Sequence, residues 1–411
     1  MVDGFSFRGE NLHTVLKRLS CLMNLQPTNP EAARVLFLFS DTGGGHRSAA
    51  EAIIEALELQ YGNAIQTEMV DIFKQYAPKP FDLLPELYPI MVRVPQAWGW
   101  GYYISNDSRR AKLIADSAWP LVRRNIRKLV KSHPCDLIVS VHPIANAPIL
   151  RALGERRPPF ITVVTDLVTT HAFWYHRRVD LCIVPTEEAR QRAFLCGLRD
   201  DQVMVVGLPV AQRFCQPPAD KNIVRQKLGW PQDRPIILLV GGGEGMGPME
   251  RVALTIDRFP LPLCLVVVCG RNHKLKSSLE AHHWNQMVKI YGFVREMPDF
   301  MQAADILVTK AGPGTITEAI NAALPMLLYS RLPGQEDGNV SYVVSRGAGF
   351  WTPTDESLTK ALHTWLENPD QYQQSVQACK QIARPTAAMD IARIIFERLP
   401  QKPKVTSPTP S

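Results

Sequence analysis

The residues best suited to chemistry stand directly after short apolar runs. His46 follows three glycines at the start of a predicted helix, and Asp41 precedes those glycines. An imidazole titrates near neutral pH, so His46 could take a proton from a hydroxyl group, with Asp41 or Asp166 orienting the ring. A histidine at this position could equally cap the helix or face solvent. The residues alone leave both possibilities open.

A glycine-rich turn marks a second candidate site within the segment 309–341. The Gly-Pro-Gly sequence at 312–314 separates an apolar strand from a helix whose predicted N-cap is Thr315. Free N–H groups and partial positive charge at a helix start suit a phosphate or diphosphate. Glu318 could close a capping box with Thr315 or face a ligand above the strand end. An ordinary strand–turn–helix unit is the alternative, because short glycine motifs are common.

Two sets of apolar runs should position these residues. The first set comprises 35–39, 137–141, 161–165, 181–184 and 203–206, and the second comprises 235–240, 263–269, 287–291, 305–309 and 325–329. A glycine-rich loop follows the opening run of each set. Continuous apolar strands that alternate with helices are typical of parallel sheets covered on both faces, which bind ligands at the carboxyl ends of the strands. The sequence therefore predicts an α/β protein with two Rossmann-like domains.

Composition limits the class of protein and its partners. The chain has 411 residues and 45% hydrophobic content, enough for two domains with their own cores. No apolar run approaches the roughly 20 residues that cross a bilayer, and no secretory signal is found at the start. Eight scattered cysteines predict a reducing, cytoplasmic compartment and no structural metal. The net charge of +7 favours an anionic partner, which could be a nucleotide, an anionic bilayer or a nucleic acid.

Two neighbouring segments depart from the regular α/β pattern. The stretch 81–103 is rich in aromatic residues, and a basic helix is predicted over 117–131 with Val122, Ile126 and Leu129 facing inward. A core lid and a solvated charged face are the alternatives. Side by side, the two segments predict a membrane-facing mouth for a lipid. A short amphipathic helix around 12–19 is expected to dock on the core rather than on a membrane.

Three segments carry a resemblance to a known family. The sequences TDLVTTHAF at 165–173, KAGPGTITEA at 310–319 and LPGQEDGNVSYV at 332–343 resemble motifs of the monogalactosyldiacylglycerol synthases and their bacterial diacylglycerol glycosyltransferase relatives. These enzymes are in turn similar to the bacterial lipid-linked peptidoglycan N-acetylglucosaminyltransferase. The resemblance covers roughly Arg34 to Leu399. It implies the GT-B architecture, in which two Rossmann-like domains face a central cleft.

The resemblance also implies an activity and its partners. We expect an inverting transfer of a hexose, most readily galactose, from a UDP-sugar to the hydroxyl of diacylglycerol. His46 is the predicted base, with Asp41 as its catalytic partner. No metal and no cofactor are expected, because the start of the helix after 312–314 can hold the diphosphate charge. The protein should act as a peripheral enzyme on the cytoplasmic side of an anionic membrane, without a nucleic-acid partner.

The predicted binding residues divide between the two domains. The donor residues are Gly242, Gly243, Phe293, Val294, Gly312, Pro313, Gly314, Thr315, Glu318, Gln335, Glu336 and Asn339. The acceptor residues are Gly44, Gly45, His142, Asp166, His171 and Trp174. Because carboxylates and amides bond sugar diols well, Glu318 should hold the ribose, and Gln335 and Glu336 the hexose.

Composition and strand pattern set most of the expected domain boundaries, and the resemblance adds the helix that crosses back. We predict an extension at 1–33, an acceptor domain at 34–212, a linker at 213–234, a donor domain at 235–384, a helix crossing back at 385–399 and a disordered tail at 400–411.

The sequence leaves several alternatives to the transfer of galactose to diacylglycerol open. Asp337 and Ser341 stand where plant members tend to carry Glu and Pro, so UDP-glucose or another lipid acceptor is an alternative. A non-catalytic relative that binds lipid or nucleotide sugar is a third possibility. A nucleic-acid-binding protein is supported by charge alone.

Overall fold

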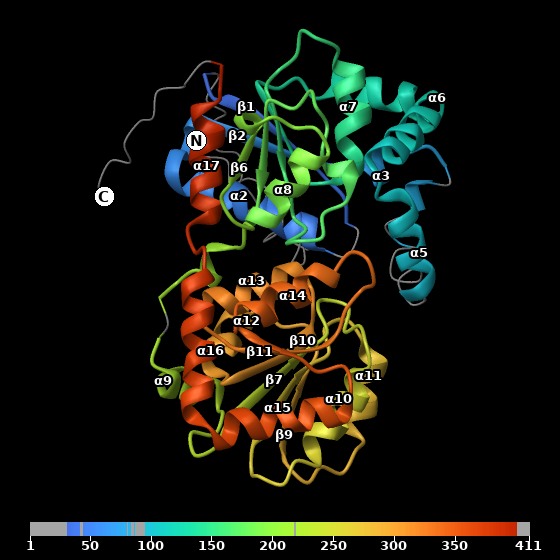
Figure 1. The fold of residues 1–411 in the computed structure, drawn as a ribbon. Helices are drawn as coiled ribbons and strands as arrows, with labels where there is room; N and C mark the ends of the chain where they lie inside the picture. Colours follow the sequence, from blue (N-terminus) through green and yellow to red (C-terminus); the bar gives the residue numbers. More distant parts are fainter. Residues whose placement is uncertain are drawn as a thin grey trace, which may run out of the picture.

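Two parallel sheets, each in its own domain, form the frame of the molecule. The computed structural model describes residues 31–41, 44–79, 81–83, 86, 95–217 and 219–400. The predicted helix around 12–19, most of the aromatic stretch before residue 95 and the predicted tail lie outside these residues. Figure 1 shows the domains one above the other, with the N-terminal domain in blue to green and the C-terminal domain in yellow to orange. Within the described residues, no helix is long and apolar enough to cross a bilayer.

The N-terminal sheet has six parallel strands in the order β2-β1-β3-β4-β5-β6. They are β1 (Ala33–Phe39), β2 (Ile65–Asp71), β3 (Leu137–Ser140), β4 (Phe160–Val163), β5 (Leu181–Val184) and β6 (Val203–Val205). The sequence analysis missed β2. This strand lies at the edge of the sheet, and exposed polar residues interrupt its apolar pattern.

The helices of this domain cover both faces of the sheet. They are α2 (Gly45–Tyr61), α3 (Ile72–Tyr76), α5 (Pro95–Ser105), α6 (Ser108–Ser132), α7 (Asn146–Leu153) and α8 (Glu187–Leu195). The helix α6 contains the predicted basic helix but begins nine residues earlier, where Asp107 caps it by accepting from the N–H groups of Arg109 and Arg110.

The C-terminal sheet repeats this design with the order β12-β11-β10-β7-β8-β9. Its strands are β7 (Ile236–Val240), β8 (Cys264–Val268), β9 (Met287–Tyr291), β10 (Ile306–Lys310), β11 (Met326–Ser330) and β12 (Gly349–Trp351). Its helices are α9 (Lys221–Leu228), α10 (Met249–Asp257), α11 (His273–Glu280), α12 (Met297–Ala303), α13 (Pro313–Asn321), α14 (Asp337–Ser345), α15 (Asp355–Glu367) and α16 (Pro369–Ile382).

Each sheet has a point where chain connections diverge to both sides. In the N-terminal domain β1 has β2 on one side and β3 on the other, and in the C-terminal domain β7 lies between β8 and β10. The loops after β1 and β3, and those after β7 and β10, therefore open into a crevice at the carboxyl edge. These are the loops in which the sequence places His46, the glycines at 241–247 and the turn at 312–314.

Apolar burial on both faces of each sheet explains why the strands read as continuous hydrophobic runs. Ile236 to Leu239 and Phe160 to Ile161 are fully buried. Their side chains divide between separate clusters above and below the sheets. Because such strands are rigid and central, their loop ends provide fixed positions for functional groups.

The predicted linker differs from the structure in one part. Residues 221–228 form α9, which is anchored in the C-terminal domain because Arg225 donates to the Ala303 carbonyl and to the Asp305 carboxylate, 2.6 Å away. The last helix, α17 (Ala387–Glu397), packs against α2 of the other domain. There the rings of Tyr61 and Phe396 stack with centroids 3.9 Å apart. Figure 1 shows α17 in red beside the N-terminal sheet.

Candidate active site

His46 lies in the first turn of α2, at the carboxyl end of β1. Its Nδ1 is 2.8 Å from Thr165 Oγ1, which follows β4. The imidazole packs edge-on against the ring of His142, with centroids 4.6 Å apart, and its centroid is 5.9 Å from that of Trp174. A Cβ added at Gly44 or Gly45 would meet no atom within 4 Å. The histidine is thus held firmly on one side, and the glycines before it leave open space.

Burial keeps the His46 ring neutral. It lowers the pKa of His46 from its usual 6.5 to about 4, and the Val141 carbonyl offsets this only in part. A neutral imidazole has one nitrogen that can accept a proton, so at neutral pH the ring is in the form that a general base requires.

Asp41 does not contact His46, which corrects the predicted pairing of these two residues. Its carboxylate accepts from Arg47, with the closest pair 2.5 Å apart, and from Lys74 at 3.3 Å. The hydrogen bonds from Arg47 keep the pKa of Asp41 below its usual value. The Asp41 carboxylate is held instead by the two neighbouring cations, Arg47 and Lys74. In this structure the His46 ring hydrogen-bonds instead with Thr165 and with the Val141 carbonyl.

Asp166 lies one residue beyond Thr165 and joins two other predicted residues. Its Oδ2 accepts from the Trp174 indole N–H at 2.7 Å, and its Oδ1 accepts from Gln335 of the other domain at 3.1 Å. Burial raises the pKa of Asp166 to about 6 in spite of these hydrogen bonds. Trp174 belongs to the short helix η4 (Ala172–Trp174) and is fully buried. Asp166 therefore does not orient His46 but connects the two halves of the cleft.

His142 and His171 occupy different parts of the acceptor side. His142 is buried between His46 and Phe73. His171 is turned toward α5: its Nε2 is 3.0 Å from Ser105 Oγ, and its Nδ1 accepts from the Phe173 N–H at the start of η4. Burial lowers the pKa of His171 to about 4. The structure thus places His142 against His46, whereas His171 contacts Ser105 of α5 and caps η4.

The helix α13 begins earlier than predicted. Gly312 is its N-cap and Pro313 its first residue, so Thr315 is inside the first turn and does not form the predicted cap with Glu318. Proline suits this position because the first N–H of a helix has no intrahelical partner. Burial raises the pKa of Glu318 to about 7, with Arg213 opposing the shift. A Cβ added at Gly314 would meet no atom within 4 Å, so a ligand can approach the backbone there.

The glycine loop after β7 lies on the other side of the switch point. Gly242 has a φ of 73°, a conformation that glycine adopts readily and other residues rarely do. A Cβ at Gly242 would lie 3.6 Å from Lys310 Cε, which shows that this loop and the end of β10 are neighbours. The helix α10 begins only at Met249, so the loop offers its own backbone rather than a helix start.

Two of the predicted donor residues, Phe293 and Val294, lie close to this loop. Phe293 is 57% exposed, and the Arg271 guanidinium lies over its ring at 4.9 Å from the centroid. Arg271 also pairs with Glu244, 2.6 Å away. Val294 packs on the core of the domain. Phe293 is thus available to a ligand, whereas the side chain of Val294 is used for packing.

The loop before α14 is more ordered than a polar loop would be. It ends at Glu336, which caps α14, so Asp337 to Asn339 are helical. Glu336 is 4% exposed; its Oε1 is 2.6 Å from Lys310 Nζ and its Oε2 accepts from the Leu332 N–H. Asn339 is buried and donates to the Ala311 carbonyl at 2.9 Å. Among these residues, Gln335 is the half-buried side chain that reaches across the cleft.

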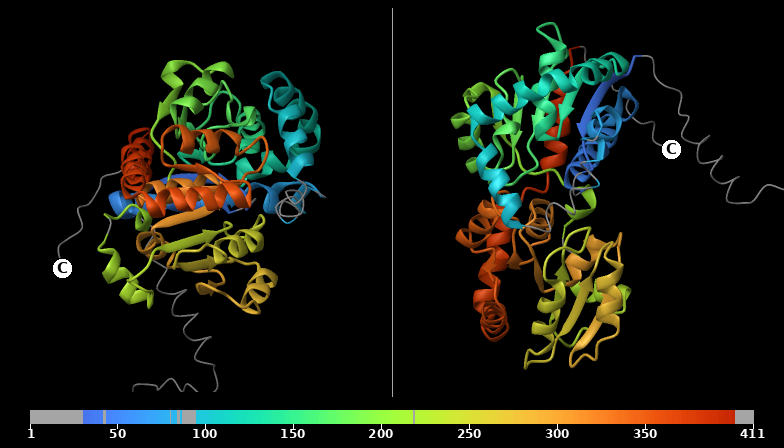
Figure 2. Two further views of the ribbon diagram at one scale, coloured as in Figure 1. Left: turned by 60° about the horizontal axis from the view of Figure 1, so that its bottom comes forward. Right: turned by 90° about the vertical axis from the view of Figure 1, so that its right-hand side faces the viewer.

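The helix α5 and the segment 166–170 reach this loop from the N-terminal domain. Figures 1 and 2 show α5 extending toward the C-terminal domain. The Tyr103 hydroxyl donates to Asp337, and the Gly338 N–H donates to Thr169 Oγ1 at 2.7 Å. A Cβ added at Gly99 would be 2.9 Å from Pro333 Cβ. The N-terminal domain thus contacts the loop before α14 directly.

Sequence reasoning missed two groups at the centre of the site. The sequence marks Thr165 only as the end of a predicted strand and Lys310 only as the first residue of the motif at 310–319. One sequence feature marks both residues: each is polar and stands at, or just beyond, the carboxyl end of a buried parallel strand. Their partners, His46 and Glu336, follow other strands.

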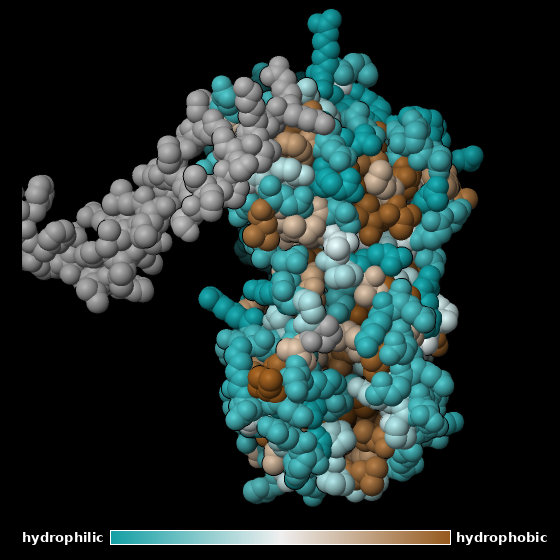
Figure 3. All heavy atoms as spheres, turned by 90° about the vertical axis from the view of Figure 1, so that its left-hand side faces the viewer, coloured by the Kyte–Doolittle hydropathy of each residue, from teal (hydrophilic) through white to brown (hydrophobic). Residues whose placement is uncertain are grey.

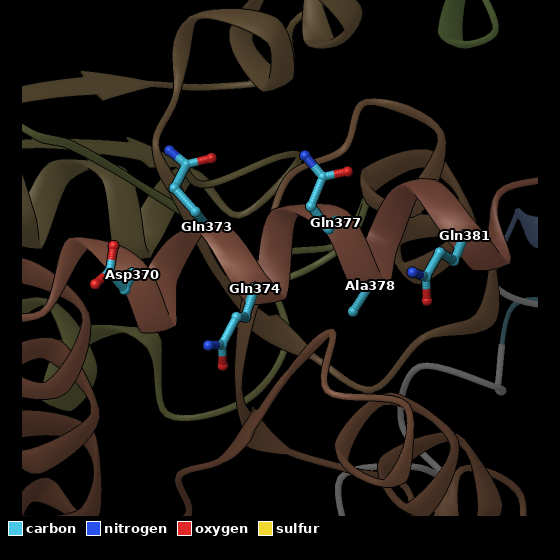
Figure 4. A pocket seen from close by; sticks show the side chains of 6 residues that line it. All are labelled: Asp370, Gln373, Gln374, Gln377, Ala378 and Gln381. Carbon is cyan, nitrogen blue, oxygen red and sulfur yellow. The ribbon is translucent and has the colours of Figure 1, made fainter.

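A shallow depression along α16 is unrelated to this site. It is lined by Asp370, Gln373, Gln374, Gln377, Ala378 and Gln381. Figure 4 shows these side chains projecting from one helix in different directions, so they do not converge on a ligand. Across the described residues, no three His, Cys, Asp or Glu side chains are grouped as a metal site.

Comparison with known proteins decides the family. Residues 46–210 match the family model of monogalactosyldiacylglycerol (MGDG) synthase, and residues 220–384 match that of glycosyl transferases group 1. The probable monogalactosyldiacylglycerol synthase 2 of Oryza sativa subsp. indica is 37% identical over 394 residues, covering 92% of this chain and 83% of the relative. The chain belongs to the monogalactosyldiacylglycerol synthase family.

Other members of the family match over similar lengths. Monogalactosyldiacylglycerol synthase 2 of Arabidopsis thaliana is 36% identical, covering 91% of this chain and 82% of its own, and the synthase of Spinacia oleracea is 37% identical, covering 96% and 77%. The synthase fold described above is confirmed as GT-B by solved structures. MurG of Acinetobacter baumannii superposes with a TM-score of 0.59 at 16% identity, covering 89% of this chain and 99% of MurG.

Proposed function

We propose that this protein transfers galactose from UDP-galactose to the hydroxyl of diacylglycerol, with inversion at the sugar, to make a β-linked monogalactosyldiacylglycerol. Membership of the monogalactosyldiacylglycerol synthase family over 92% of the chain supports the reaction class. In this proposal the N-terminal domain binds the lipid acceptor and the C-terminal domain binds the nucleotide sugar. The predicted division at 34–212 and 235–384 is kept as the proposed domain boundary.

The observation that carries the proposal is the hydrogen bond between Gln335 and Asp166. Gln335 lies in the loop before α14, which we expect to bind the sugar. The hydrogen bond places this side chain 3.1 Å from Asp166, the neighbour of Thr165, which hydrogen-bonds with the His46 ring. A transfer reaction needs the donor carbon and the acceptor oxygen to meet in one place. A protein that only stored a nucleotide or a lipid would not need two half-sites in register.

The proposed reaction proceeds in one displacement. The diacylglycerol oxygen bonds to C1 of the sugar while its proton passes to the neutral His46 imidazole. The bond from C1 to the diphosphate oxygen breaks, and its electron pair leaves with UDP. The first turn of α13 and the backbone at Gly242 and Gly243 would stabilise the departing charge. Phe293 would contact the uracil of UDP, and Glu318 would contact its ribose.

A direct assay tests the reaction and the sugar together. Purified protein should release UDP and form a hexosyl lipid when UDP-galactose is offered with vesicles that contain diacylglycerol, and mass analysis of the lipids identifies the product. Vesicles without diacylglycerol are the control. Turnover of UDP-glucose with no turnover of UDP-galactose would overturn the sugar assignment. Absence of UDP release with either sugar would overturn the enzyme assignment.

UDP-glucose is the second candidate donor because of Asp337. Its carboxylate accepts from Gly334 N–H at 2.9 Å, pairs with Arg331 at 2.7 Å and accepts from Tyr103. Asp337 therefore holds the shape of the loop from which Gln335 would meet the sugar. Plant members tend to carry the longer Glu at this position, so the shorter Asp337 would change the shape of the loop without touching the sugar.

We further propose that the protein works as a peripheral enzyme on the cytoplasmic side of a membrane. The described cysteines are free thiols, which suits a reducing compartment. The surface of α5 and α6 supports membrane contact: it exposes Trp100, Tyr103, Ile104, Leu113, Ile114 and Leu121. Basic residues of α6 lie among them, and Ile126 and Leu129 are buried beneath. Figure 3 shows the opposite side of the molecule, where hydrophobic residues form separate groups on a mostly hydrophilic surface.

Replacing Leu113 and Leu121 by serine should lower vesicle binding by at least about tenfold, because each leucine contributes more than about 1 kcal/mol on leaving water. These side chains are 67% and 64% exposed, so the fold should be unaffected. Flotation with anionic vesicles measures the effect. Leu195→Ser is the matched control, since Leu195 is 78% exposed on α8. Equal binding by the double variant and the control would contradict the proposed surface.

A further inference from the structure

Lys310 is a cation held at the centre of the proposed donor site. It is the last residue of β10, two positions before the N-cap of α13. Its Nζ lies 2.6 Å from Glu336 Oε1, and the two side chains are 19% and 5% exposed. Removing such a pair from water is unfavourable, so burial of a lysine and a glutamate together is weak evidence for a role in stability. A role in binding explains their place better.

The position of the ammonium is defined by the backbone around it. A Cβ added at Gly312 would lie 3.0 Å from Lys310 Nζ, and one added at Gly242 would lie 3.6 Å from Lys310 Cε. Strands β7 and β10 are paired, with Thr309 opposite Val240, so the loops that follow them must lie side by side. Lys310 therefore lies between the two backbone segments proposed to hold the diphosphate.

Glu336 fixes the lysine rather than competing with a ligand for it. Its second oxygen accepts from the Leu332 N–H at 2.7 Å, so both carboxylate oxygens have a protein partner. One carboxylate oxygen can engage only part of an ammonium, which has three donors. The remaining N–H groups of Lys310 are therefore available to an anion placed between Gly242 and Gly312.

We propose that Lys310 is a diphosphate-binding residue of the donor site and that Glu336 holds its ammonium in place. This inference rests on the proposed function, in which the site takes a UDP-sugar. When the C1–oxygen bond breaks, the electron pair moves onto the diphosphate, and the charge near Lys310 becomes more negative. The interaction therefore strengthens as the reaction proceeds, which is the condition for an effect on rate as well as on binding.

The test compares UDP with uridine, which lacks the diphosphate. In Lys310→Met the Kd for UDP should rise at least about tenfold, while the Kd for uridine should stay within about twofold, because only UDP presents charge to the missing ammonium. Isothermal titration calorimetry on the full-length protein measures both. Lys227→Met is the control, since Lys227 pairs with Asp299 at 2.7 Å on the exposed helix α9.

A second variant removes the buried carboxylate that Lys310→Met would leave without its partner. Lys310→Met combined with Glu336→Gln should still bind UDP at least about tenfold more weakly than the native protein. Native affinity for UDP in this double variant would overturn the inference. An equal loss for UDP and uridine would also overturn it, because such a loss reflects general damage to the site. Failure of the native protein to bind UDP would instead overturn the proposed function.

Discussion

Substituting His46 by alanine should lower kcat by about 10²- to 10⁴-fold and leave the Kd for UDP unchanged, because general-base catalysis contributes a factor of this size. The ring is held by Thr165 at 2.8 Å and by contact with His142, and none of these residues belongs to the donor domain. The loss should therefore fall on the chemical step. Steady-state rates with diacylglycerol vesicles, together with calorimetry for UDP, measure both quantities.

A matched histidine provides the control for this experiment. His283 is exposed in the loop between α11 and β9, at the amino end of β9, whereas the proposed site lies at the carboxyl ends of the strands. His283→Ala should keep kcat within about twofold of the native value, as surface substitutions usually do. A His46→Ala enzyme with nearly native kcat would show that the base is another group. A parallel loss of UDP binding would show that the substitution disturbs the whole cleft.

Replacing Asp166 by asparagine should lower kcat/KM for the donor by about 10- to 100-fold. The ionised carboxylate accepts from both Trp174 and Gln335, and hydrogen bonds to a charged group contribute about 1.5–3 kcal/mol. Asparagine offers one accepting oxygen, so one of the two N–H donors would face its amide. Gln335 would lose its fixed position in the sugar loop, and donor use should suffer more than lipid binding.

The pH dependence of the reaction separates Asp166 from His46. Burial raises the pKa of Asp166 from 3.8 to about 6, so its carboxylate is ionised above that pH and protonated as the pH falls through it. Native kcat/KM should therefore fall on the acid side near pH 6. His46, with a pKa of about 4, is still neutral there and cannot cause this decline. Asp166→Asn should lack the step near pH 6 and should keep any step near pH 7 that comes from Glu318, the proposed ribose ligand, because burial raises the pKa of Glu318 to about 7.

The control for Asp166 is another contact between the domains. Glu188 pairs with Arg346 at 2.7 Å on the surface, where exposed ion pairs contribute less than about 1 kcal/mol. Glu188→Gln should keep kcat/KM within about twofold and retain the acid limb. If the two variants behave alike, domain contact in general, and not the Asp166–Gln335 bond, determines donor use.

The contacts between α5 and the sugar loop have a consequence for how the two substrates meet. The helix belongs to the acceptor domain and to the proposed membrane surface, yet Tyr102 packs against Gly334 and Tyr103 donates to Asp337. The proposed lipid docking at α5 and the shape of the loop before α14 would therefore be coupled through this one helix. In contrast, α17 connects the domains on the side of the molecule away from α5 (Figure 1).

The sequence predicted much of the fold because the relevant signals are local. Runs such as 236–240 and 306–308 are apolar throughout, and only a strand buried on both faces requires this. The glycines before His46 and at 312–314 indicate where such a strand ends. Errors occurred where local signals compete: Thr315 is a good N-cap in isolation, but Pro313 fits the first helical position, so the helix begins three residues earlier than predicted.

The sequence by itself determined which residues stand at strand ends, and hence the two half-sites and the family. Only the tertiary structure decided which of these residues touch. Thr165 and His46 are 119 positions apart, and Asp166 and Gln335 are 169 apart in different domains. No local pattern encodes such pairs, because they depend on strand order, on register and on how two separately folded domains meet. We therefore propose Thr165 in place of Asp41 as the residue that orients His46, and the proposal for Lys310 depends on its contact with Glu336.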